Sequence, residues 1–218
     1  MLSVVIPTLN AAAFLPGTLE RMRAADEIVV VDGGSSDDSD AIAGRLGASL
    51  VRSPKGRGVQ LRAGAEAAGG DWLLFLHADS LPGPGWRETV AAHAAAAPDA
   101  AACFRLRLAD PAWQARLVER AVAARVRLFG LPYGDQGLLV PRSLYDEVGG
   151  YRPLPLMEDV DLVRRIGRRR LRVLDEPAFT SAERWRRDGW ARRSARNLAC
   201  LALYRLGVDP ERLVRLYR

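Results

Sequence analysis

Short apolar runs that alternate with helical patterns fill the first third of the chain. The first run, LSVVI, ends at Pro7, and the second, EIVVVD, is rich in β-branched residues. Runs of this length and composition predict buried strands. The segments between them have helical patterns, and Asn10 is placed to cap the first helix. The predicted strands are 2–6, 27–32, 48–53 and one within 71–79, and the predicted helices are 11–23 and 57–68.

The second half of the chain is less regular. The run CFRLRLA alternates apolar and polar residues, as a half-exposed strand does. No internal repeat occurs, and no linker divides the chain into two domains. The predicted helices are 84–97, 111–128, one that opens within 157–166, 188–206 and 209–217, and the predicted strands are 103–109, 137–141 and 171–177.

These patterns predict an α/β fold. Strands that are apolar throughout and alternate with helices favour a mostly parallel central sheet with helices on both faces. Ligands of such sheets bind at the carboxyl ends of the strands. Polar clusters follow three of the predicted strands, at Pro7–Asn10, Asp32–Ser35 and His77–Asp79. We therefore expect the three clusters to converge at one binding edge.

The composition excludes several classes of protein. Of the 218 residues, 49% are hydrophobic, which is typical of globular domains and excludes a disordered or fibrous chain. No stretch approaches the ~20 uninterrupted apolar residues of a membrane-spanning helix. The chain opens directly into a strand pattern without a basic leader, so we expect a cytoplasmic location. Cys103 and Cys200 lack metal-type spacing and are expected to be reduced thiols in the core.

Positive charge is concentrated at the C-terminus. Residues 184–218 carry ten arginines against three acidic residues, a net charge of +7, whereas the whole chain carries +6. We expect a main domain over 1–183 and a basic helical extension over 184–218 that packs on it. Arginines interleaved with apolar residues suit peripheral contact with an anionic membrane. The alternative is a solvated arginine face over packed helices. No nucleic-acid-binding module is recognisable, so we expect no nucleic acid partner.

Two aspartates follow predicted strands directly. Asp32 precedes two glycines, and its carboxylate can accept hydrogen bonds from a base or a ribose, or can cap the next helix. A dinucleotide-binding loop would need three spaced glycines after the first strand, where PTLN stands instead. Asp79 follows LLFLHA, where a carboxylate can hold a divalent cation that bridges diphosphate oxygens. A single aspartate after a strand is common, so this position alone is weak evidence.

The segment MEDVDLVRRI places a carboxylate among apolar positions. A carboxylate at the mouth of an apolar helix face is partly desolvated yet kept ionised by the helix terminus, as a general base requires. The alternative is that the first acidic residues are only favourable charges in the first helical turn. On a helix, the apolar face comprises Asp159, Leu162, Val163 and Ile166, and the polar face comprises Glu158, Asp161 and Arg165, of which the last two are spaced for an ion pair.

Together these segments resemble family 2 glycosyltransferases with the GT-A fold. The matching segments, in the family's order, are SVVIPTLN, EIVVVDGGSSDDS, GRGVQLRAGAEAAGGDWLLFLHADS, GLLVPRSLYDEVGGY and MEDVDLVRRI, and they span residues 2–166. The combination of LHAD and PYGDQG is similar to a bacterial subgroup of small members. The resemblance implies inverting transfer of a sugar from a nucleoside diphosphate sugar to a hydroxyl acceptor. A lipid-linked acceptor is one option.

The resemblance also implies roles for particular residues. Asp159 matches the general base, and Asp79 matches the last aspartate of the metal-binding motif, with Mn2+ or Mg2+ as the cofactor. Arg184 and Trp185 lie in a loop that often closes over the diphosphate, although packing is an equal alternative. The residues expected at the substrates are Pro7, Thr8, Asn10, Asp32, Lys55, Arg57, His77, Asp79, Asp135, Gln136, Glu158, Arg184 and Trp185.

Some positions leave alternatives open. His77 stands where the family has an acidic residue, and imidazole is a poorer ligand for Mg2+ than for Mn2+. His77 is a ligand, a hydrogen-bond donor to the diphosphate, or a residue behind the ligands. Arg62 replaces an asparagine of many relatives and is a phosphate contact or a solvated residue. Asp135 and Gln136, before a strand, are expected to contact sugar hydroxyls or to form a turn.

Two other functions remain open. A nucleotidyltransferase that makes sugar nucleotides has a related fold, but it generally carries a Gly-rich basic loop after the first strand, and PTLNAAAF has neither feature. A non-catalytic, transferase-like binding module is the second alternative, and His77 is its best support.

Overall fold

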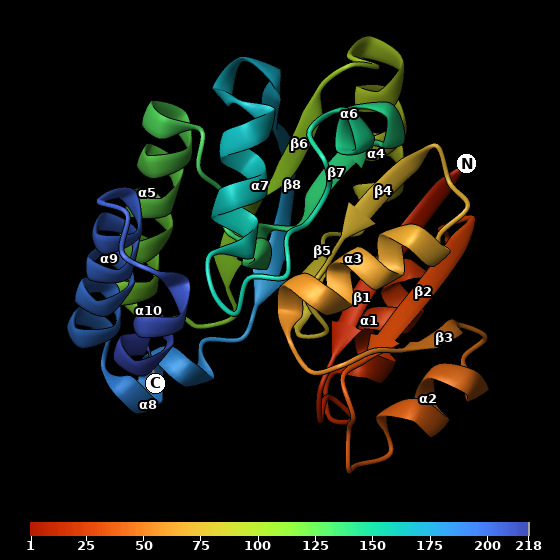
Figure 1. The fold of residues 1–218 in the computed structure, drawn as a ribbon, viewed down its shortest axis with the longest axis horizontal. Coiled ribbons are helices and arrows are strands. Elements are labelled where there is room, and N and C mark those ends of the chain that lie inside the picture. The colour runs from red at the N-terminus through yellow and green to blue at the C-terminus, as the bar shows by residue number, and fades with distance from the viewer. Residues whose placement is uncertain (218) are drawn as a thin grey trace.

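The fold is built on a twisted sheet covered by helices on both faces (Figure 1). A computed structural model describes residues 1–217. The strands in this range are β1 Leu2–Thr8, β2 Glu27–Asp32, β3 Ser49–Arg52, β4 Trp72–Phe75, β5 Ser80–Pro82, β6 Ala101–Leu108, β7 Leu138–Pro141 and β8 Leu171–Thr180. They form one sheet in the order β3-β2-β1-β4-β7-β6-β8-β5. The predicted α/β class is confirmed.

The half of the sheet formed by β1 to β4 is parallel, as its apolar strands predicted. β1 pairs with β2 on one side and with β4 on the other, and β2 pairs with β3. The register places Thr8 opposite Asp32. The carboxyl ends of β1 and β2 are therefore neighbours, which brings the polar segments after them together.

The other half of the sheet is mixed. β7 is antiparallel to both β4 and β6, β8 is parallel to β6, and the short β5 is antiparallel to β8. The prediction of a mostly parallel sheet thus describes the N-terminal half best. β5 was not predicted, because three residues are too few to give a periodic pattern.

Helices cover the two faces of the sheet through alternate residues of the strands. Val5 of β1 packs in a cluster with α3, α6, α7, α9 and α10, whereas Val4 and Ile6 pack with α1, α2 and α4. A third cluster joins α5 to β6. The helices are α1 Leu15–Met22, α2 Ser39–Arg45, α3 Arg57–Ala67, α4 Trp86–Ala96, α5 Trp113–Phe129, α6 Arg142–Glu147, α7 Glu158–Ile166, α8 Glu183–Asp188, α9 Trp190–Arg205 and α10 Pro210–Tyr217, with 3₁₀ turns at Gly134–Gln136 and Arg168–Arg170.

The predicted N-cap at Asn10 is wrong. α1 begins at Leu15, and its N-cap position is Phe14, whose side chain makes no capping hydrogen bond. Asn10 has a φ of 53°, in the left-handed region, and its Oδ1 accepts a hydrogen bond from the N–H of Ser36 at 2.8 Å. Its side chain therefore joins the loops after β1 and β2 instead of capping the first helix.

The C-terminal helices share the main core. Cys200 and Leu201 of α9 and Leu213 of α10 are buried in the same cluster as Val160 of α7. Cys103 and Cys200 are both buried free thiols, as predicted. None of the helices in residues 1–217 is long and apolar enough to cross a membrane. The short helix α8 was not predicted and precedes the expected helix at 188–206.

Candidate active site

Two clefts meet at the carboxyl ends of β1 and β4. One has about 820 Å³ of empty space, including the open solvent at its mouth, and the other about 1110 Å³ on the same measure. Four predicted site residues line both clefts, namely Arg57, His77, Asp79 and Arg184. Asp135, Glu158, Asp159 and Trp185 also line the first cleft, and Pro7, Thr8, Asn10 and Lys55 also line the second.

The second cleft is walled by the loop after β1, which is rigidly held. The hydroxyl of Thr8 donates to the carbonyl of Val31 at 3.2 Å, inside the sheet. The N–H of Asn10 donates to Ser35 Oγ at 2.9 Å. These bonds fix the loop after β1 to the loop after β2, so that the cleft has a pre-formed wall.

Asp32 lies beneath this wall and lines neither cleft. Its side chain is buried, and its Oδ2 accepts hydrogen bonds from the N–H groups of Gly34 at 2.8 Å and Ser35 at 2.9 Å. Ser35 Oγ also donates to Oδ1. In this arrangement the carboxylate shapes the loop after β2, and a base or ribose would have to replace one of these bonds to reach it.

Gln60 is a structural residue of the site that the sequence did not single out. It lies on α3 and is buried, and its Nε2 donates to the carbonyls of Thr8 at 2.7 Å and Val31 at 2.9 Å. A Cβ at Gly33 would lie 3.0 Å from the amide of Gln60. The sequence feature that could have identified Gln60 is that it is a lone glutamine in an Ala- and Gly-rich helix. It lies on the side of that helix that packs against the strands.

Asp79 is the carboxylate best placed to hold a cation. It is partly exposed in both clefts, and it makes no hydrogen bond or ion pair to the described residues. No group of three or more His, Cys, Asp or Glu side chains suited to a metal occurs within residues 1–217. Mg2+ is usually held by one or two carboxylates together with substrate phosphates. The donor set therefore fits a cation shared with a diphosphate, rather than a cation held by the protein alone.

His77 lies at the junction of the two clefts as a neutral imidazole. Burial, together with the positive charges of Arg57 and Arg184, holds the pKa of His77 well below its usual range. Its buried Nε2 has no hydrogen-bond partner among the described residues, and a Cβ at Gly134 would lie 2.5 Å from it. A neutral imidazole with a free nitrogen suits a ligand or hydrogen-bond role.

The start of α7 is brought to the cleft by two unusual backbone positions. Met157, just before the helix, has a φ of 65°, which is uncommon for a residue with a side chain. A Cβ at Gly58 of α3 would lie 2.3 Å from the carbonyl of Arg152, so only glycine lets the loop before α7 pack so closely. As a result, Arg57 Nη1 lies 3.3 Å from Glu158 Oε1, an ion pair not aligned for a hydrogen bond.

Asp159 faces the first cleft from the first turn of α7. The N–H of Gly134 donates to its Oδ2 at 2.8 Å and fixes the orientation of the carboxylate. Asp159 and Asp79 line the same cleft, as the predicted mechanism requires. Burial lowers the pKa of Arg57, but the carboxylates of Glu158 and Asp159 raise it overall. Arg57 therefore remains a cation between the two clefts.

Glu158 and Asp161 are not on a polar face, contrary to the helical pattern. Their exposed fractions are 2% and 8%. The pattern assumed one buried side, whereas α3 covers the start of α7 and Tyr204 of α9 reaches Asp161. Burial, reinforced by Asp159 and opposed by Arg57, raises the pKa of Glu158 to about 7.

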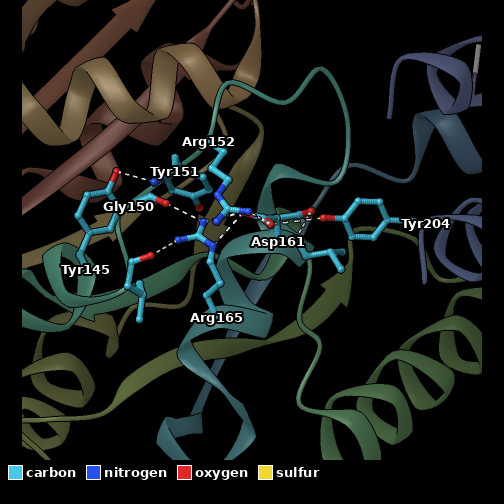
Figure 2. A network of polar contacts seen from close by, with 10 residues as sticks. Tyr145, Gly150, Tyr151, Arg152, Asp161, Arg165 and Tyr204 are labelled. Carbon is cyan, nitrogen blue, oxygen red and sulfur yellow. Dashed lines mark hydrogen bonds and ion pairs between the residues drawn. The ribbon is translucent and has the colours of Figure 1, made fainter. Parts of the chain in front are cut away.

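A polar network holds α7 in place (Figure 2). Arg165 donates to Asp161 Oδ2 at 2.6 Å, which confirms the predicted ion pair, and to the carbonyl of Gly150 at 2.7 Å. Arg152 lies 3.3 Å from Asp161 on the other side. Figure 2 shows the two guanidinium groups converging on Asp161, with Tyr204 approaching from α9.

The turn Gly134–Gln136 contains two predicted site residues, Asp135 and Gln136, whose side chains lie on different sides of the turn. Asp135 lines the first cleft, where burial, opposed by Arg125 and reinforced by Asp159, raises its pKa to about 6. The side chain of Gln136 is buried on the other side and donates to the carbonyl of Phe104 at 3.0 Å. Gln136 lines neither cleft of the site, so the structure does not bring it to the predicted sugar contact.

The C-terminal helices complete one wall of the first cleft. Trp185 stacks on Trp190 with ring centroids 5.8 Å apart and still lines the cleft. Arg193 is buried and donates to Asp188 at 2.8 Å. Lining residues that the sequence did not single out include Tyr133 and Thr180 and, from the tail, Arg193, Asn197 and Tyr217. Only their position in the fold identifies the three tail residues, because the pattern of the tail predicted a solvated or membrane-facing surface.

Comparison with known proteins assigns the family. The model of glycosyl transferase family 2 matches residues 3–154, well over half of the chain. The chain therefore belongs to this family, as the motifs predicted.

Two curated relatives illustrate its range. A PGL/p-HBAD biosynthesis glycosyltransferase of Mycobacterium tuberculosis is 43% identical over 90 residues, which cover 36% of this chain and 35% of the relative. An undecaprenyl-phosphate 4-deoxy-4-formamido-L-arabinose transferase of Pseudomonas aeruginosa is 34% identical over 158 residues, 64% of this chain and 46% of the relative. The chain thus spans less than half the length of these relatives.

Solved structures share the fold. A mannosyltransferase from Pyrobaculum calidifontis, in complex with GDP-Man and Mn2+, aligns with a TM-score of 0.68 and 18% identity, over 91% of this chain and 60% of that one. Glucosyl-3-phosphoglycerate synthase from Mycobacterium tuberculosis, with Mn2+, UDP and glucosyl-3-phosphoglycerate, aligns with a TM-score of 0.58 and 21% identity, over 83% of this chain and 70% of that one. At these identities the similarity establishes the fold.

Proposed function

We propose that the chain is an inverting glycosyltransferase that moves a sugar from a nucleoside diphosphate sugar to a hydroxyl acceptor. The observation that carries the proposal is that Asp79 and Asp159 line one cleft, which meets a second cleft at Asp79. The carboxylate proposed to act at the leaving group, Asp79, and the carboxylate proposed to act at the acceptor, Asp159, thus line the same cleft. Membership of the family supports the same reaction. Within the family, we propose that the chain belongs to a bacterial subgroup of small members with the motifs LHAD and PYGDQG.

The second cleft is proposed as the nucleotide site. Its pre-formed wall of Thr8 and Asn10 lines the cleft together with Lys55, which suits a flat base and a ribose. The diphosphate then lies where the clefts meet, between Arg57 and Arg184. The forked donors of arginine match phosphate oxygens. The complexes of the structural neighbours with GDP-Man and UDP support this placement.

A divalent cation is the proposed cofactor, held by Asp79 with the neutral His77 beside it. When bound, the cation would offset the negative charge that develops on the departing diphosphate. One carboxylate and one imidazole suit Mn2+ better than Mg2+. Structures of the neighbouring synthase hold UDP with Mn2+ or with Mg2+, which supports a divalent cation of either kind.

Asp159 is the proposed general base. It takes the proton of the acceptor hydroxyl while the acceptor oxygen bonds to the anomeric carbon and the bond from that carbon to the diphosphate oxygen breaks. Because the oxygen attacks from the face opposite the leaving group, the configuration inverts. The N–H of Gly134 holds the carboxylate in one orientation for this transfer. Asp135 lies in the same cleft and is proposed to contact hydroxyls of the donor sugar.

The acceptor is proposed to enter along the wall formed by α8 to α10. Trp185 offers a face to a sugar ring, and Tyr217 and Asn197 offer polar atoms. On this proposal the extension over 184–218 is part of the site. The relative named for undecaprenyl phosphate supports a lipid-linked acceptor as one alternative. A cytoplasmic location remains part of the proposal.

Donor binding and product stereochemistry test the proposal together. A panel of nucleoside diphosphates and nucleotide sugars, with and without Mn2+, should raise the melting temperature for one nucleotide, because a ligand that binds the native state stabilises it. The anomeric configuration of the transfer product, measured by NMR, should be opposite to that of the donor. Pyrophosphate release from a nucleoside triphosphate and a sugar phosphate would instead identify a nucleotidyltransferase. Absence of any shift with every donor and cation would favour a non-catalytic module.

A further inference from the structure

Helix α5 exposes an apolar stripe that nothing in residues 1–217 covers. The exposed fractions are 67% for Trp113, 50% for Leu117 and 59% for Leu128. Together with the exposed Ala121 and Ala124, these residues recur at helical spacing along one side of the helix. Contiguous exposed apolar surface of this kind marks a contact with a partner or a membrane.

Arginines border the stripe on one side. On the helical wheel, Arg120 and Arg127 fall between the apolar stripe and the buried side of α5. Neither forms an ion pair with any described residue, although exposed arginines elsewhere on the protein do. The single acidic residue of α5, Glu119, is buried and already pairs with Arg107 and Arg116 at 2.8 Å. The border of the stripe is thus positive and free to meet an anion.

A groove runs beside these arginines, between α5 and the strands β6 and β8. It has about 1190 Å³ of empty space, including open solvent. Its floor is apolar, with Leu106 and Val126, and Arg120 and Arg127 line it as cations without an ion pair to the described residues. Arg105 and Arg107 also line it and are paired with Asp175 and Glu119. An apolar floor with a cationic rim matches an amphiphile with a phosphate head group.

The C-terminal helices, for which the sequence left membrane contact and a solvated arginine face as alternatives, bury much of their apolar surface. Trp185 and Trp190 stack on each other, and Leu201 is buried in the core. Leu198 of α9 and Leu206, directly after α9, remain exposed. α9 lies beside α5 (Figure 1), and their ends meet where Arg205 lies 5.9 Å from the ring of Phe129. The apolar surface is therefore centred on α5, with α9 at its border.

We propose that α5 docks this protein on the surface of an anionic phospholipid bilayer. The stripe from Trp113 to Leu128 enters the boundary of the acyl chains, and Arg120 and Arg127 meet lipid phosphates, with head groups reaching the groove. Charge complementarity favours a bilayer: α5 carries four arginines and one acidic residue, and the sequence of residues 184–218 carries a net charge of +7. Trp and Leu opposite a basic border are the composition of interfacial helices. This inference concerns binding and goes beyond the proposed reaction.

Co-sedimentation with vesicles tests the proposal without any activity assay. Vesicles of phosphatidylcholine with about one third phosphatidylserine should bind the protein, and pure phosphatidylcholine vesicles should bind it far less. Arg120→Gln combined with Arg127→Gln should weaken binding about fivefold per arginine, and high salt should act in the same direction. Leu117→Glu, at an exposed position, should weaken binding without changing the melting temperature.

Matched controls lie at the opposite end of the molecule, on α2. Leu46→Glu and Arg45→Gln also change an exposed leucine and an exposed arginine, and both should bind vesicles as the unaltered protein does. The proposal is overturned if both vesicle types bind equally, or if Leu117→Glu and Leu46→Glu behave alike. It is also overturned if the stripe holds a second copy, seen as a dimer that Leu117→Glu dissociates without vesicle binding. Donor-induced stabilisation should be unchanged in every variant, so failure of docking and failure of the transferase proposal are distinguishable.

Discussion

Gly134 stands between two groups that the proposed reaction needs. Its N–H holds Asp159 Oδ2 at 2.8 Å, and the space where its Cβ would lie is 2.5 Å from His77 Nε2. Any side chain at this position must displace the imidazole or the turn, and a displaced turn releases Asp159. The orientation of the proposed base therefore depends on a residue that makes no contact with substrate in the proposal.

Gly134→Ala should lower the rate of sugar transfer by one or more orders of magnitude, because small displacements of a catalytic group are costly. Gly17→Ala is the matched control, since a Cβ at Gly17 meets nothing within 4 Å. That control should keep its activity and gain slightly in stability. Steady-state kinetics of the two variants check this, and equal rates would show that Gly134 does not position the base.

Burial of Glu158 makes stability depend on pH. Its pKa is about 7 in the folded chain, against 4.5 for the free side chain. Below about pH 4.5 the carboxyl group of Glu158 is protonated in both the folded and the unfolded state. Between about pH 4.5 and 7 the unfolded chain releases this proton, whereas the folded chain retains it. The free energy of unfolding should therefore fall as the pH rises from about 4.5 to about 7. Glu158→Gln should flatten the fall, and Glu66→Gln, on the exposed side of α3, should not. Urea unfolding at a series of pH values measures this dependence. Parallel curves of unfolding free energy against pH for the unaltered protein and both variants would contradict the raised pKa of Glu158.

Residue types in the motifs predicted where several residues of the cleft lie. His77 and Asp79 come shortly after the end of β4, and Asp159 stands at the start of a helix among apolar positions, and all three line the first cleft. Gln136 was not, because the turn that contains it directs neighbouring side chains to opposite sides. The wall formed by Arg193 and Tyr217 was missed, since it depends on how distant helices pack.

At the scale of elements, α7 is fixed by polar contacts rather than by apolar packing alone. Arg165 joins Asp161 of its own helix to the carbonyls of Val148 and Gly150 (Figure 2). The loop before α7 therefore moves with the helix. The loop before α7 also packs on Gly58 of α3. This attachment therefore sets the position of Asp159 relative to Asp79.

Arg165→Met should destabilise the fold by about 3–5 kcal/mol, because it breaks a largely buried ion pair and leaves loop carbonyls without a donor. Arg62→Met is the control, since Arg62 forms a solvent-exposed pair with Glu66 on α3, and its loss should change stability little. Urea denaturation gives both values. A small effect for Arg165→Met would mean that packing alone places α7.

The elements themselves were predictable where the apolar pattern is long. β1, β2 and β4 and the long helices α5 and α9 appear at the predicted places. β5 and α8 were missed because each is too short to show a period. The prediction that Asn10 caps the first helix was wrong because its backbone adopts a positive φ. The burial of the polar side of α7 was not predictable, since a sequence pattern does not show which distant helices cover it.

At the scale of the whole molecule, one of the apolar clusters within residues 1–217 extends from the parallel strands to α10. It contains Val5 of β1, Val160 of α7 and Leu213 of α10. The C-terminal helices wall the cleft and share this core, so unfolding them separately would expose apolar surface of the sheet. We therefore expect the domain and its proposed extension to unfold as one cooperative unit.

Leu213→Ala should cost about 2–5 kcal/mol, as buried leucines do, with one transition by both fluorescence and circular dichroism. Leu216→Ala, on the same helix but 46% exposed, should change stability little. Two separate transitions would show that the extension folds independently of the sheet.

The position of Asp159 depends on all three levels of structure. Helix α7, the loop before it and the shared apolar core together place its carboxylate in the cleft that Asp79 also lines. Asp159→Asn should lower the turnover rate by about 10²- to 10⁴-fold, the usual contribution of a general base, and leave the dissociation constant of the donor essentially unchanged. Asp175→Asn, at a carboxylate whose side chain is 93% exposed, should alter neither value. Retained turnover in Asp159→Asn, or a loss of donor affinity as large as the loss of rate, would contradict the proposed mechanism.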